Sequence, residues 1–299
     1  MILSRVHLFC FVASYAVALL FELSRLLFRA RVRLIAAAGF TLAGLFAQSV
    51  FIVMRTTSDA QSAPPLSSWF DWLLLLSWGV AVVYLCLLVR RPQTAIGLFL
   101  LPLVLVLIGV AAQFRHVAPF PRSEALRAWG IIHGIALLAG AVSVTLGFAA
   151  GVMYLVQSYR LKHKLPPRQG LRLPSLEWLQ RATRQSLLVS SFLLGAGLLA
   201  GVALNLVRQR GGLPWTDPVI WTSGILFAWL VLVLLFEWWY KPAQQGRKVA
   251  YLTLASFVFL AWVLGIVLWG PSQHAASRAP RAVRAVEGDS GTIGGEALR

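Results

Sequence analysis

Charged residues, and acidic ones above all, are scarce in this 299-residue chain. They make up 12% of it against 59% hydrophobic residues, whereas soluble domains carry about 25% charged residues. The mean hydropathy is +0.75, and this composition excludes a water-soluble enzyme. Only 10 Asp and Glu oppose 27 Lys and Arg, which gives a formal net charge of +17. In a soluble chain that surplus would indicate nucleic acid. In so apolar a chain it indicates membrane orientation, and we expect no nucleic-acid partner.

Cysteines and common catalytic motifs are scarce as well. Cys10 and Cys86 lie in apolar runs and predict neither a disulfide framework nor a thiolate metal site. The sequence has no phosphate-binding glycine loop, and the absence of a convincing internal repeat disfavours an inverted-repeat transporter. The middle of every apolar run is free of ionisable residues. Glu22, Asp71 and Glu237 lie near the ends of such runs, where a carboxylate can reach water or an arginine.

What the chain has is long apolar runs, each of about 20 residues, enough to cross a bilayer as a helix. They lie near 6–28, 33–54, 69–89, 94–114, 129–157, 186–207, 218–239 and 249–269. They predict an all-α polytopic integral membrane helix bundle with about eight transmembrane helices. We expect the first run to be a retained helix, because its basic cluster follows it rather than precedes it. We divide the chain into a membrane region at 1–128, a second at 129–275 and a disordered tail at 276–299.

The distribution of basic residues predicts the orientation. The loops after the first, third, fifth and seventh runs hold 16 of the 27 Lys and Arg, and basic residues favour the cytoplasmic side. Both termini are therefore expected outside, which places the protein as a multi-pass component of the bacterial inner (plasma) membrane. The region 158–185 is the most basic loop, and within it Pro174-Ser175 predicts a short capped helix on the membrane surface. Gly147/Gly151 and Gly197/Gly201 predict close helix packing.

Histidine and tryptophan gather on the predicted outer side. His133 follows Trp129 by one helical turn, and His274 follows the last apolar run. Two imidazoles on one membrane face have the chemistry of an axial pair for one heme iron, although interfacial histidines also serve as polar anchors. The stretch 215–221 contains Trp215, Asp217 and Trp221, whose flat indoles can line a planar macrocycle. Arginines on the same side can pair with propionates. They are Arg115, Arg122, Arg127, Arg208 and Arg210.

From about 129 to 275 the sequence resembles the cytochrome c assembly family, the CcsA/HemX-like membrane proteins. The resemblance rests on the order and spacing of several short elements. They are Trp129-Gly-Ile-Ile-His133, Gly151-Val-Met-Tyr154-Leu155, Leu161-Lys-His-Lys164, Leu173-Pro-Ser-Leu-Glu177, Gly201, Trp215-Thr-Asp-Pro218, Gly246-Arg247-Lys248-Val-Ala250-Tyr251 and His274. The resemblance implies that His133 and His274 are external heme ligands, with the tryptophan loop as a platform between them. In the full synthases this platform presents heme to the thiols of apocytochrome c.

Two departures bring the chain closer to the HemX-like branch. Its tryptophan loop is shorter than in complete synthases, and Phe236-Glu237 stands where they carry an inner histidine. The resemblance implies a cytochrome c biogenesis component that binds or presents heme, with a second biogenesis membrane subunit, apocytochrome c and the lipid bilayer as partners. The alternative is a non-catalytic HemX-type regulator or scaffold of tetrapyrrole synthesis, whose working surface would be the loop 158–185. A small-molecule transporter ranks third.

Overall fold

The computed structural model describes residues 8–25, 32–58, 68–115, 128–164, 172–208, 218–239 and 247–269. Within these ranges the chain forms eight α-helices and no strand, which confirms the all-α class. The helices are α1 (Leu8–Ser24), α2 (Val32–Ser58), α3 (Trp69–Arg90), α4 (Gly97–Gln113), α6 (Ala128–Lys162), α7 (Leu176–Arg208), α8 (Pro218–Trp239) and α9 (Arg247–Trp269). Each covers one predicted apolar run. The tail 276–299 lies outside the described residues.

One predicted element is wrong. The short surface helix expected after Pro174-Ser175 is instead the first part of α7, which continues unbroken for 33 residues. Ser175 starts this helix, because its hydroxyl accepts a hydrogen bond from the Trp178 amide at 3.3 Å. No glycine or proline follows that would end the helix before the apolar run. Leu179 is fully buried in the main core, so this segment packs inside the bundle.

Four of the helices are long and apolar enough to cross a membrane. These stretches are Arg33–Thr57, Trp69–Arg90, Gly130–Lys162 and Leu176–Ala203. The distribution of side chains agrees with a membrane environment, since large apolar side chains such as Phe9, Phe46 and Phe192 are exposed while Gln48 and Ser77 are completely buried. Polar groups inside and apolar groups outside are typical of helix bundles in lipid.

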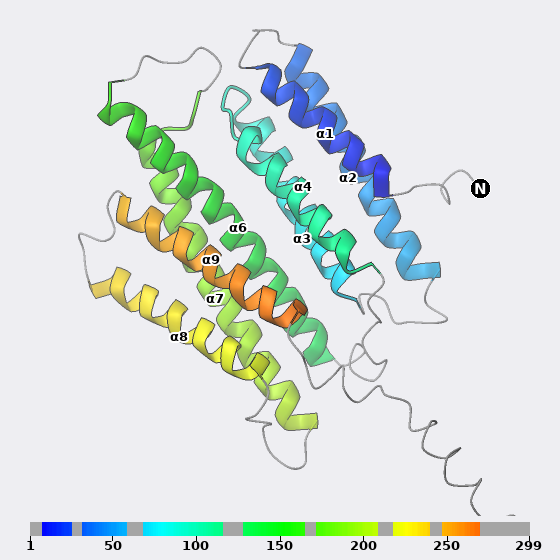
Figure 1. Cartoon of the computed structure of the whole chain (residues 1–299), viewed down its shortest axis with the longest axis vertical. Helices are drawn as coiled ribbons and strands as arrows, with labels where there is room; N and C mark the ends of the chain where they lie inside the picture. The colour runs from blue at the N-terminus through cyan, green and yellow to red at the C-terminus, as the bar shows by residue number, and fades with distance from the viewer. Residues whose placement is uncertain are drawn as a thin grey trace, which may run out of the picture.

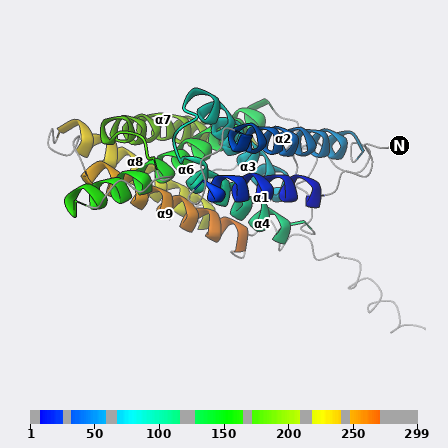
Figure 2. The same cartoon turned by 90° about the horizontal axis from the view of Figure 1, so that it is seen from above.

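The helices run side by side and alternate in direction along the chain (Figure 1). The helices α1–α4 form one half of the bundle and α6–α9 the other, and seen from above the two halves lie next to each other (Figure 2). Helix α6 joins them, because it packs against α3 and α4 as well as against α7 and α9. The starts of α6 and α8 and the ends of α7 and α9 therefore lie toward the same end of the molecule (Figure 1).

Candidate functional site

His133 lies in the second turn of α6 and contacts α7. Its Nδ1 atom lies 2.6 Å from the carbonyl oxygen of Gly197. A carbonyl oxygen only accepts hydrogen bonds, so Nδ1 carries a proton and donates it. In the neutral ring Nε2 then keeps the lone pair that binds metal ions. Such a bond fixes the tautomer and the ring orientation of metal-ligating histidines.

A glycine on α7 makes room for the His133 ring. A Cβ atom added at Gly201 would lie 2.8 Å from Cε1 and 2.9 Å from Nδ1 of His133. One turn earlier, a Cβ atom at Gly197 would lie 2.7 Å from Leu137 Cδ2. The close packing predicted for this glycine pair is thus confirmed, and it has a second consequence. The pair holds an imidazole between α6 and α7.

Only part of the predicted site lies within the described residues. Trp221 stands in the first turn of α8, and its side chain is 59% exposed. His274, Trp215 and Asp217 lie outside the described residues. The helix ends that flank them, namely the start of α8 and the end of α9, lie toward the same end of the bundle as the start of α6 (Figure 1). The structure therefore brings the starts of α6 and α8 and the end of α9 to one end of the bundle.

An aromatic side chain from the first half of the chain, which the sequence does not single out, also lies beside this region. Trp72, in the first turn of α3, packs so closely on α6 that a Cβ atom at Gly134 would lie 2.5 Å from its Cη2. Gly134 directly follows His133, so the indole fixes the same turn of α6 from the side of α3. The Trp69-Phe-Asp-Trp72 sequence is typical of interfacial aromatic residues. In the sequence, only Gly134 on α6 indicates that a side chain from another helix packs closely here.

Of the three carboxylates near helix ends, two have described side chains, and both contact an arginine as expected. The Arg55 Nε atom lies 2.7 Å from Asp71 Oδ1, and the Ser68 hydroxyl donates to Asp71 Oδ2 at 2.8 Å. At the opposite end of the bundle, Glu22 is 4% exposed and lies 3.7 Å from the Arg25 Nη1 atom. The Glu237 side chain lies outside the described part.

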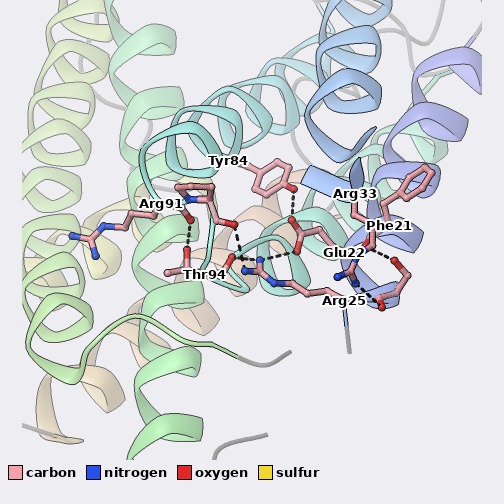
Figure 3. Close-up of polar contacts among 9 residues, drawn as sticks. Phe21, Glu22, Arg25, Arg33, Tyr84, Arg91 and Thr94 are labelled. Atoms are coloured by element: carbon pink, nitrogen blue, oxygen red, sulfur yellow. Dashed lines mark hydrogen bonds and ion pairs between the residues drawn. The ribbon is translucent and has the colours of Figure 1, made fainter. Parts of the chain in front are cut away.

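The contacts of Glu22 link α1 to the α3–α4 connection (Figure 3). The Tyr84 hydroxyl of α3 donates to Glu22 Oε1 at 3.1 Å, and Arg25 donates to the Thr94 carbonyl oxygen at 2.6 Å. A Cβ atom at Gly97 would lie 2.7 Å from Glu22 Cγ, so α4 begins directly against this carboxylate. The cluster pairs its charges internally and serves to hold three helices together.

The side chains at the site limit what it can hold. Among the described residues, no group of three or more His, Cys, Asp and Glu side chains could hold a metal ion. A bis-histidine heme site needs only two protein ligands, and His133 has the donor chemistry of one. Comparison of the whole chain with family models, with curated proteins and with solved structures gives no match.

Proposed function

We propose that this protein is a cytochrome c biogenesis component that binds or presents heme at the outer face of the bacterial inner membrane. His133 and His274 are the proposed axial ligands, and Trp215, Asp217 and Trp221 belong to the platform beside the macrocycle. The observation that carries the proposal is the Nδ1–carbonyl bond of His133 to Gly197. That bond orients Nε2 as the ligating nitrogen.

The proposed division of labour follows from the chemistry of these side chains. Heme supplies the iron and the reactive vinyl groups, and the protein supplies binding and orientation. His133 holds its ring in one tautomer between α6 and α7, while the half-buried position of the side chain keeps it partly out of water. The outer arginines are the proposed partners of the propionates, with Arg115 exposed at the end of α4. Apocytochrome c and a second biogenesis membrane subunit are the proposed partners.

Absorption spectroscopy of the purified full-length protein tests this proposal. We expect a low-spin bis-histidine heme spectrum that is lost in His133→Ala and in His274→Ala. His163→Ala is the matched control, because this exposed histidine packs on Tyr159 at a ring distance of 4.3 Å near the opposite end of α6. It should leave the spectrum unchanged. A preparation that is colourless and remains so after heme is added would overturn the proposal.

The second candidate is the HemX-type regulator or scaffold of tetrapyrrole synthesis. The observation that favours it is the basic end of the bundle. Lys162 ends α6 and Lys164 follows it, and Arg181 and Arg184 lie on exposed positions of α7. Such a surface suits an acidic protein partner. Under this candidate, charge reversal at these positions should abolish the effect of the protein on tetrapyrrole synthesis, while His133→Ala and His274→Ala should retain that effect. The reverse pattern supports heme presentation.

A further inference from the structure

The two halves of the bundle meet at a pair of arginines on the basic end. The Arg91 guanidinium lies over the Trp178 ring of α7, with its Cζ atom 4.6 Å from the ring centroid. Arg172 lies just before α7 and donates to Gln93 Oε1 at 2.8 Å. The Arg172 carbonyl oxygen accepts a hydrogen bond from the Ala95 amide at 2.8 Å. We call Arg91 and Arg172, with these contacts, the arginine junction.

Neither guanidinium of the junction is used up by these contacts. Both arginines are exposed, and each guanidinium has five N–H donors in one plane. Stacking on Trp178 uses the flat face of Arg91 and leaves its edge for hydrogen bonds. Arg172 commits one nitrogen to Gln93. The two side chains are thus held in place by uncharged groups, with donors left over.

Negative charge is scarce around the junction. The described acidic side chains at this end are Glu22, which is buried beside Arg25, and Glu177, whose Oε1 atom lies 2.9 Å from Arg181 Nη2. The described basic side chains at this end are far more numerous. They are Arg25, Arg33, Arg90, Arg91, Arg160, Lys162, Lys164, Arg172, Arg181 and Arg184. Among the described side chains, basic groups at this end therefore outnumber acidic ones, and they give the junction a positive electrostatic field.

The position of the junction along the helices selects the kind of anion. The apolar stretch of α3 ends at Arg90, and Arg91 directly follows it. Arg91 thus lies where the apolar surface of α3 gives way to polar chain, a level that we assign to lipid head groups. Arg172 is tied to the same connection through Gln93. Planar guanidinium groups bind phosphate with paired hydrogen bonds. Basic pockets between transmembrane helices bind anionic lipid head groups on the cytoplasmic side.

We propose that the arginine junction is a binding site for the phosphate of an anionic phospholipid, which clamps α3–α4 to α7. The lipid phosphate accepts hydrogen bonds from Arg91 and Arg172, and its acyl chains lie along the apolar outer faces of the helices. Because one arginine comes from each half of the bundle, bound lipid stabilises the contact between the halves. This site is independent of the heme site proposed at the other end.

Thermal unfolding of the full-length protein in detergent tests the lipid site. We expect phosphatidylglycerol to raise the unfolding midpoint more than phosphatidylcholine does, because a ligand that binds only the folded state stabilises it. R91Q/R172Q should lose most of the difference. The matched control is K162Q/K164Q, which removes two exposed charges from the same end of the bundle and should keep the difference. The single variants R91Q and R172Q should each lose part of it, and they serve if the double variant does not fold.

Three results would overturn the proposal. Equal stabilisation by both lipids would show that head-group charge is not recognised. Equal losses in R91Q/R172Q and K162Q/K164Q would assign the effect to the whole basic surface rather than to the junction. The same shift with inorganic phosphate alone would replace a lipid site with a free-anion site. Retention of the heme spectrum in R91Q/R172Q keeps this test separate from that of the proposed function.

Discussion

The two halves of the bundle differ in the contacts that hold the helices of each half together. In α1–α4 the contacts include buried side-chain hydrogen bonds and ion pairs. The Tyr15 hydroxyl donates to Gln48 Oε1 at 2.8 Å, and Gln48 Nε2 donates to Ser77 Oγ at 2.9 Å. In α6–α9 the helices approach at glycines, since a Cβ atom at Gly140 would lie 2.7 Å from Leu194 Cγ, and one at Gly151 would lie 2.8 Å from Leu254 Cδ1.

We call α1–α4 the fastened half, because buried hydrogen bonds between side chains of different helices predominate there among the described residues. We call α6–α9 the packed half, because close glycine contacts predominate there, although Gly44 also approaches Tyr15 and Trp229 donates to Ser256 at 3.2 Å. Hydrogen bonds between side chains fix one pairing of helices, because a shift leaves donors unsatisfied. Glycine contacts depend on surface shape and allow the backbones to come near each other. The proposed heme ligand His133 lies in the packed half, whereas the buried carboxylate Glu22 lies in the fastened half. Substitutions of polar groups and of glycines should therefore act differently in the two halves.

The largest effect is expected at Glu22. Glu22→Ala leaves Arg25 without its carboxylate and the buried Tyr84 hydroxyl without its acceptor. Removing one partner of a buried ion pair costs about 3–5 kcal/mol. Equilibrium unfolding in mixed micelles measures this loss. The control is Glu177→Ala, because that carboxylate is 82% exposed in its pair with Arg181. Equal losses for the two variants would contradict the role of buried pairs in the first half.

A smaller effect is expected at Gly140 in the packed half. Gly140→Ala places a methyl group against the Leu194 side chain and within 3.2 Å of its backbone nitrogen. Overpacking of this kind costs about 1–3 kcal/mol. Gly224→Ala is the matched control, since a Cβ atom there meets nothing within 4 Å. The same unfolding assay should show a loss only for Gly140→Ala. If both alanines are tolerated, the glycine contacts do not hold this half together.

The smallest effect is expected at Tyr15. Tyr15→Phe keeps the ring and removes the hydroxyl that donates to Gln48, so the free energy of unfolding should fall by about 1 kcal/mol. Tyr159→Phe is the control, because that side chain is 58% exposed and should show no measurable change. A double-mutant cycle of Tyr15→Phe with Gln48→Leu should give a coupling energy of about 1 kcal/mol. If the two changes in unfolding free energy simply add, the Tyr15–Gln48 hydrogen bond does not contribute to the stability of the fastened half.

Much of the fold follows from the apolar runs. Each described helix covers a predicted run, because a bilayer requires about 20 apolar residues per crossing. The exception is α7, whose polar first turns are predicted from the sequence as a separate surface helix. The segment belongs to the basic region 158–185 and is predicted to lie on the membrane surface, yet Leu179 and Thr183 are buried. The sequence does not reveal this burial, because the core around Leu179 is formed by residues of other helices.

The candidate site was predictable only at the level of residue types. The sequence singles out His133 and the Gly197/Gly201 pair separately. It does not predict that the imidazole packs against those glycines, because His133 and Gly197 are 64 positions apart in the chain. Trp72 and the Glu22–Tyr84 contact escaped prediction for the same reason, because each partner comes from another helix. The number of membrane crossings, the orientation and the heme ligands stay predictions.

Helix α6 is one continuous rod, and this has a mechanical consequence. It spans 35 residues from Ala128 to Lys162, which corresponds to about 50 Å at the usual rise per residue. His133 lies near one end and the basic residues near the other. An α-helix resists a change in length because such a change strains its backbone hydrogen bonds. The position of His133 along the bundle is therefore coupled through the helix to that of Lys162 at its other end.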